Sequence, residues 1–205
     1  MALELDHLVV CAQSLAEGAG HVSALTGAVL QPGGRHAAMG TRNLLLSLGP
    51  SLYLGVIAID PDAPAPRRPR WFALDEFTGP PRLAHWVARC DDLEAALAEA
   101  PAGAGEIMAL SRGDLRWHMA VPGSGRLPFG GMFPGLIEWQ GRAHPAARLP
   151  DSGYRLLVLE VIHPRASELA ACLPELGGAP VAFAAGPRPV LRARLSTPAG
   201  DVVLQ

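Results

Sequence analysis

The strongest constraint on the fold is an order of elements that recurs along the chain. Residues 3–10 have the apolar pattern of a buried strand, residues 14–27 predict a helix ending at Gly27, and strands are expected around 29–40, at 43–48 and at 51–59. The same order returns at 83–90, 93–100, 106–110, 115–121 and 135–140, where Asp91 and Asp92 precede the helix as its cap. A strand–helix–strands unit that is used twice predicts two similar modules.

A third, weaker copy follows these two. It consists of a strand at 154–162, a helix at 167–176 capped by Ser167 and closed by Gly177 and Gly178, and strands at 180–185, 190–196 and 201–205. We therefore expect a first module at 1–60, a second at 82–141 and a partial third at 153–205. Residues 61–81 are expected to form a linker rich in proline and arginine, and residues 142–152 a connector.

Composition excludes several function classes. All 17 basic residues are arginine, so the chain has no lysine for a Schiff base, and acid–base chemistry must fall on His and Glu. The net charge of −2 gives no reason to expect nucleic acid or an anionic membrane as a partner. The longest apolar runs are far shorter than the roughly 20 residues that span a bilayer.

The same composition predicts where the protein works. Abundant Ala, Gly, Pro and Arg are typical of a bacterial genome rich in G and C. The N-terminus is acidic where a secretory signal is basic, and three cysteines without a CxxC spacing predict buried free thiols. We therefore expect a cytoplasmic protein.

Three polar residues in predicted strands are candidates for a metal site. His7 and His85 occupy equivalent positions in the first strands of the two modules, and Glu138 stands in the last strand of the second. Two imidazoles and a carboxylate suit Fe(II), Mn(II), Ni(II) or Zn(II). The alternative is that the histidines are hydrogen-bonded core residues and that Glu138 lies on the outward face of its strand.

Several motifs resemble a known superfamily. Asp-His-Leu-Val-Val at 6–10, Gly-Gly-Arg-His at 33–36, Gly-Thr-Arg-Asn at 40–43, Leu-Ala-His-Trp at 83–86 and Leu-Ile-Glu-Trp at 136–139 are similar to vicinal-oxygen-chelate proteins, in particular to glyoxalase-like domains. The resemblance covers about residues 3–145. It implies an α+β fold in which paired βαβββ modules form a curved mixed-sheet cup around a metal, with the C-terminal module as an addition.

The resemblance also implies site residues. His7, His85 and Glu138 match three of the family's metal ligands, and Glu138 would also carry protons as the catalytic carboxylate. The fourth ligand falls at Gly55, which has no side chain. The remaining set resembles that of ring-cleaving dioxygenases in the superfamily.

Four further residues are candidates for binding a substrate. His36, Asn43 and Arg35 belong to a segment rich in glycine, where the backbone can approach a ligand closely. His36 could also replace the missing ligand at Gly55. His118, in the second module, is a candidate acid or base.

Two functions remain open at this point. The first is a metal-dependent lyase, isomerase or ring-cleaving dioxygenase acting on a small substrate that chelates the metal through oxygen. The second is a protein on the same fold that sequesters a small molecule without converting it, because Gly55 removes part of the metal site. A partial third module leaves an unpaired face or edge, so a homodimer is also expected.

Overall fold

A computed structural model describes residues 3–173, 176 and 178–205. The first module follows the predicted order of elements closely. Ser14 caps its helix by accepting a hydrogen bond from the Glu17 amide, and Gly27 ends the helix with a left-handed φ of 73°. The elements are β1 (Glu4–Cys11), α1 (Leu15–Thr26), β2 (Gln31–His36), β3 (Thr41–Ser47) and β4 (Tyr53–Ile59).

The second module repeats this arrangement. Asp92 caps its helix through a hydrogen bond from the Ala95 amide, as the acidic pair in the sequence predicts. The elements are β5 (Arg82–Arg89), α2 (Leu93–Glu99), β6 (Glu106–Arg112), β7 (Leu115–Val121) and β8 (Gly135–Trp139), with short 3-10 turns η1 (Trp71–Glu76) before the module, η2 (Phe129–Gly131) within it and η3 (Ala146–Arg148) after it.

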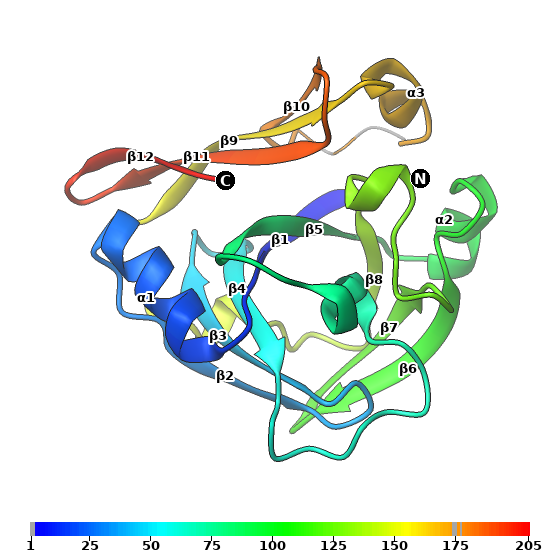
Figure 1. The fold of residues 1–205 in the computed structure, drawn as a ribbon, viewed down its shortest axis with the longest axis horizontal. Coiled ribbons are helices and arrows are strands. Elements are labelled where there is room, and N and C mark those ends of the chain that lie inside the picture. The colour runs from blue at the N-terminus through cyan, green and yellow to red at the C-terminus, as the bar shows by residue number, and fades with distance from the viewer. Residues whose placement is uncertain (1–2, 174–175, 177) are drawn as a thin grey trace.

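The two modules share one curled sheet. Its strand order is β2-β3-β4-β1-β5-β8-β7-β6, and β1 pairs antiparallel with β5 at the centre. In each module the first strand runs parallel to the last, β1 beside β4 and β5 beside β8. The curl brings the edge strands β2 and β6 together, and η1 lies inside it (Figure 1). The predicted α+β class and the paired βαβββ cup are thus confirmed.

The third module has the predicted element order but a different strand order. Its elements are β9 (Arg155–His163), α3 (Ala166–Ala171), β10 (Val181–Ala185), β11 (Val190–Thr197) and β12 (Gly200–Leu204). They form a separate sheet of order β10-β9-β11-β12, in which β9 runs parallel to the strand that follows its helix. The predicted cap at Ser167 is wrong, because the helix starts one residue earlier and has Arg165 at its N-cap position. Gly177 lies outside the described residues.

The third sheet covers the convex side of the cup (Figure 1). Leu159, Leu191 and Leu195 are fully or almost fully buried in the same apolar cluster as Leu8 of β1 and Trp86 of β5. A second apolar cluster fills the concave side. The sequence predicted that a partial third module would leave an unpaired face or edge, but this module packs on the rest of the chain. The expectation of a homodimer therefore loses this argument.

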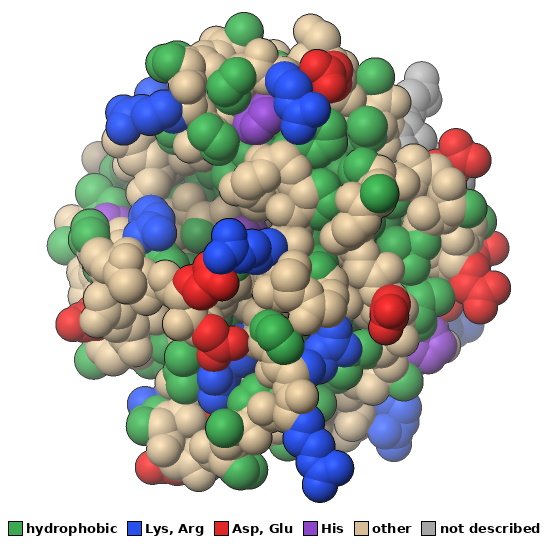
Figure 2. All heavy atoms as spheres, turned by 45° about the vertical axis from the view of Figure 1, so that its right-hand side comes forward, with side chains coloured by type: hydrophobic (Ala, Val, Ile, Leu, Met, Phe, Trp, Pro, Cys, Tyr) green, Lys and Arg blue, Asp and Glu red, His purple; other side chains and the backbone are tan. Residues whose placement is uncertain are grey.

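The outer surface carries mixed charge. On the face shown in Figure 2, arginine and acidic side chains are interspersed rather than separated by sign. The exposed ion pairs of the molecule include Arg148 with Asp114 and Arg155 with Asp151. Exposed pairs of this kind add little stability, so the two apolar clusters are what hold the fold together.

Two further features bear on the sequence predictions. Cys11 and Cys90 are buried free thiols, as expected, and Cys172 is half-buried and also free. Within the described ranges, no helix has the length and apolar character that crossing a membrane requires.

Candidate functional site

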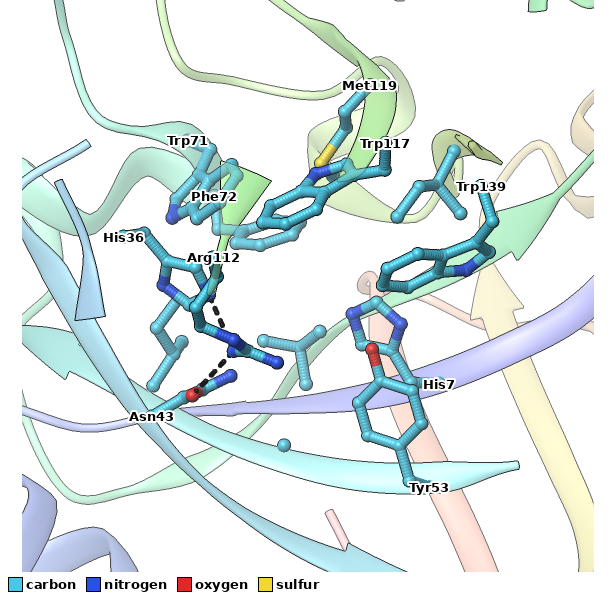
Figure 3. A pocket seen from close by; sticks show the side chains of 14 residues that line it. His7, His36, Asn43, Tyr53, Trp71, Phe72, Arg112, Trp117, Met119 and Trp139 are labelled. Atoms are coloured by element: carbon cyan, nitrogen blue, oxygen red, sulfur yellow. Dashed lines mark hydrogen bonds between the residues drawn. The ribbon is translucent and has the colours of Figure 1, made fainter. Parts of the chain in front are cut away.

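A cavity of about 50 Å³ lies on the concave side of the curled sheet (Figure 3). Strands from both modules line it, and aromatic rings form most of its wall. These rings are Tyr53, Trp71, Phe72, Trp117 and Trp139. Aromatic walls with a few polar groups are typical of sites that bind small molecules.

Part of the wall comes from the segment predicted to be a linker. Trp71 and Phe72 are almost completely buried there. Phe72 and Ala73 have left-handed φ values of 58° and 50°. Such a backbone costs a bulky residue about 1–2 kcal/mol, and strained residues of this kind cluster at functional sites. Sequence reasoning missed this wall because the prolines before it indicated only an extended connection.

His7 is in the cavity, and a β-bulge orients it. The register of β1 against β5 shifts between Leu5 and His7, so Asp6 is an extra residue in the strand. Successive side chains of a regular strand face opposite sides of the sheet, but the bulge lets those of Asp6 and His7 meet. The His7 Nδ1 atom lies 2.6 Å from Asp6 Oδ1. The ring of His7 stacks on Tyr53 with a centroid distance of 4.5 Å. Because Nδ1 donates to the carboxylate, Nε2 is left as the acceptor.

Asp6 is a fully buried carboxylate. Its Oδ2 accepts hydrogen bonds from Trp139 Nε1 at 2.8 Å and from His144 Nε2 at 2.9 Å. Burial alone raises the pKa of Asp6, but the hydrogen bonds from His144 and His7 outweigh it and hold the pKa well below its usual value. Asp6 therefore stays ionised and fixes three rings around one end of the cavity.

The other end of the cavity holds Arg112, His36 and Asn43 (Figure 3). Arg112 Nη1 donates to His36 Nε2 and to Asn43 Oδ1, each at 3.0 Å. His36 Nδ1 lies 3.1 Å from the Thr41 hydroxyl. Burial, and next the charge of Arg112, lower the pKa of His36 to about 3, so His36 is neutral and accepts from the guanidinium. The predictions at His36 and Asn43 thus fall on residues that line the cavity, whereas Arg112 was missed.

His85 does not share the cavity with His7. Its ring stacks on Phe72 at a centroid distance of 5.0 Å, outside the aromatic wall. Nε2 lies 3.1 Å from the Phe72 carbonyl oxygen and Nδ1 3.3 Å from that of Gly131. Burial lowers the pKa of His85 to about 4, against the raising effect of these carbonyls. His85 is therefore a hydrogen-bonded core histidine, which was the alternative to a metal ligand in the sequence analysis.

Glu138 points away from the cavity. Ile137 and Trp139 line the cavity, so alternation along β8 places Glu138 on the other face. There its carboxylate accepts from the Leu93 amide at the start of α2 and from Gln140 Nε2. His118, 3.9 Å from the same carboxylate, is on this outer face as well. Arg35 is also outside the cavity, because it pairs with Asp60 and Asp62.

The predicted metal ligands therefore do not converge. His7 lines the cavity, His85 lies behind Phe72, and Glu138 is across the sheet. Among residues 3–173, 176 and 178–205, no three His, Cys, Asp or Glu side chains are grouped so that they could hold a metal ion. The donors present do not fit the divalent site that the resemblance implies.

Gly55 lines the cavity, as expected for the position of the missing ligand. A Cβ atom built there would have ordinary contacts, 3.7 Å from Leu45 Cδ2 and 3.8 Å from the Leu8 carbonyl oxygen. The backbone therefore has room for a side chain. Glycine at this position leaves the floor of the cavity open.

The fold and the site define a class: proteins in which two βαβββ modules curl around a central cavity. Sequence comparison specifies the class further, since the model of the glyoxalase-like domain family matches residues 5–177. The chain belongs to the glyoxalase-like domain family. No curated protein has a significant sequence match to it.

The fold recurs in a solved structure of low sequence identity. A hypothetical protein from Staphylococcus aureus has a TM-score of 0.64 at 14% identity, over 92% of this chain and 88% of that one. Methylmalonyl-CoA epimerase from Mycobacterium tuberculosis has a TM-score of 0.45 at 17% identity, over 68% and 89% of the two chains. The Streptomyces coelicolor epimerase, in complex with 2-nitronate-propionyl-CoA, has a TM-score of 0.44 at 14% identity, over 70% and 100%.

Proposed function

We propose that the protein binds a small organic molecule in the cavity of the cup without a metal ion held by His7, His85 and Glu138. The observation that carries this proposal is the cavity itself, which combines five aromatic side chains with a polar group at each end. The metal-dependent lyase, isomerase or dioxygenase activity expected from the sequence needs a ligand set that the positions of these three residues do not supply.

The two polar ends give the cavity a direction. Asp6 holds His7 at one end, and Arg112 lies with His36 and Asn43 at the other. The rings between them supply apolar contact, while the polar ends orient the ligand. This arrangement supports binding of a short, flat molecule with an oxygen function at each end.

The tryptophans provide a direct test. Trp71, Trp117 and Trp139 line the cavity, whereas Trp86 is buried elsewhere and donates to the Met132 carbonyl oxygen. Titrating ¹⁵N-labelled protein with pyruvate, pyruvamide, acetate and acetamide should shift the three cavity indole signals and leave that of Trp86 in place. If none of these compounds moves a cavity indole, or if all four indoles move together, binding in the cup is contradicted.

One observation favours a second candidate function, proton transfer on the bound molecule. The bulge at Asp6 orients His7 with a free Nε2 acceptor, the arrangement that positions an imidazole as a general base. His7 would take a proton from a carbon next to a carbonyl and return it. Exchange of the methyl hydrogens of pyruvate in D₂O tests this. His7→Gln should abolish the exchange while pyruvate still shifts the Trp117 indole, and exchange that survives the substitution contradicts this role.

A further inference from the structure

Arg112 is the arginine that lines the cavity. Arg35 pairs with Asp60 and Asp62, and Arg148 pairs with Asp114. Within the described part of the chain, no carboxylate forms an ion pair with Arg112. Its hydrogen-bond partners, His36 Nε2 and Asn43 Oδ1, are both neutral acceptors.

This cation is partly buried at the cavity that Trp71 and Trp117 line. A guanidinium stays protonated at any physiological pH, so it cannot escape the cost of burial by losing its proton. Neutral acceptors offset only part of the cost of removing part of the guanidinium from water. An anion in the cavity would supply the missing charge.

The glycines of β2 make room for this arrangement. A side chain at Gly33 would overlap the Asn43 amide oxygen, and a Cβ atom at Gly34 would lie 2.7 Å from Arg112 Cδ. Gly34 also has a φ of 136°, which disfavours other residues. The sequence Gly-Gly at 33–34 therefore lets Arg112 of β6 reach across to β2 and β3.

We propose that the ligand of the cup is a short-chain carboxylate whose carboxyl group pairs with Arg112, an inference that rests on the proposed function. The Asn43 amide and the Arg112 fork bind the carboxylate end, and His7 faces the other end of the molecule (Figure 3). Arg112 is then a residue that determines specificity, because it selects acids over neutral molecules of the same shape.

The cavity volume limits the length of the acid. About 50 Å³ is free while Arg112 hydrogen-bonds to His36 and Asn43. For comparison, an engineered protein cavity that binds benzene has a volume of about 150 Å³. The free volume therefore favours an acid of the size of acetate or pyruvate over an aromatic acid.

Matched acid and amide pairs test the inference. Acetate with acetamide and pyruvate with pyruvamide have nearly the same shape and differ in charge. Titrations followed by the indole signals of Trp71, Trp117 and Trp139 should show each acid binding about tenfold or more tightly than its amide, since a charge-assisted pair is worth about 1.5–3 kcal/mol. Arg112→Gln should abolish this preference, and Arg112→Lys, which keeps the charge, should retain part of it.

Arg116→Gln is the matched control, because Arg116 is an exposed arginine on the neighbouring strand β7. It should keep the full preference for acids. The inference is overturned if acids and amides bind wild-type protein equally. It is also overturned if the Arg112→Gln variant still prefers acids while its native Trp86 indole signal shows that it is folded. Binding of both members of a pair with equal affinity would leave the proposed function standing, whereas binding of none would remove the proposed function too.

Discussion

Replacing Asp6 by asparagine tests how the cup is held together. The carboxylate is completely buried and accepts from His7 Nδ1 at 2.6 Å, Trp139 Nε1 at 2.8 Å and His144 Nε2 at 2.9 Å. Asparagine keeps one acceptor oxygen and places an amide NH₂ where the other was. At least one ring N–H then faces a donor, and the remaining bonds lose the help of a full charge.

The expected loss follows from these bonds. One unsatisfied buried donor costs about 1–3 kcal/mol, and two bonds that change from charged to neutral acceptors lose about 1 kcal/mol each. Asp6→Asn should therefore lower the free energy of unfolding by about 3–5 kcal/mol, the range expected for breaking a buried polar network. Urea unfolding followed by circular dichroism measures it.

The control is Asp62→Asn, which removes an exposed partner of Arg35 and should cost less than about 1 kcal/mol. A value for Asp6→Asn within about 1 kcal/mol of wild type would refute the role of Asp6 as the buried anchor of His7, Trp139 and His144.

Three further predictions concern acid stability and the cavity. Because the pKa of His36 is lowered to about 3 and that of His85 to about 4, both stay neutral in the folded protein, while the unfolded chain protonates them below a pKa of about 6.5. Above a pH of about 6.5 this difference in protonation does not lower the free energy of unfolding. As the pH drops from there toward 4, the free energy of unfolding should fall by up to about 2.7 kcal/mol per pH unit, because the unfolded chain binds the two protons and the folded protein does not. A flat profile of stability against pH from urea unfolding would contradict this prediction. His85→Gln should halve this slope. Gly55→Glu should abolish pyruvate binding, measured by the indole shifts, because a second carboxylate would share the cavity with Arg112, and unchanged affinity would place Gly55 outside the site. Gly34→Ala should displace Arg112 and reduce the preference for pyruvate over pyruvamide, and an unchanged preference would count against the role of the glycine.

The elements could be predicted because their signals are local. Ser14 and Asp92 cap helices as their positions in the sequence indicate, and apolar runs bounded by glycine and proline identify the strands. The strand order of the third module could not be predicted in the same way. The pairing of β9 with β10 depends on contacts between distant segments, which leave no periodic signal in either strand.

The site was predicted only in part, for reasons that individual residues make clear. Glu138 could have been placed on the outer face, because Ile137 and Trp139 flank it and alternate residues of a strand face opposite sides. The position of His85 outside the cavity could not have been predicted, because its Nε2 lies against the carbonyl oxygen of Phe72, a residue of the segment before the module. Arg112 reaches the cavity only because the two modules curl together, and its sequence neighbours show no sign of this.

A crystal structure of the protein with pyruvate tests the central claim most directly. The expected result is a carboxylate inside the cup, with its oxygens within about 2.7–2.9 Å of the Arg112 guanidinium nitrogens and the carbonyl end directed toward His7. Pyruvate bound outside the cup, or a divalent ion on His7 with Arg112 free of the ligand, would contradict the claim.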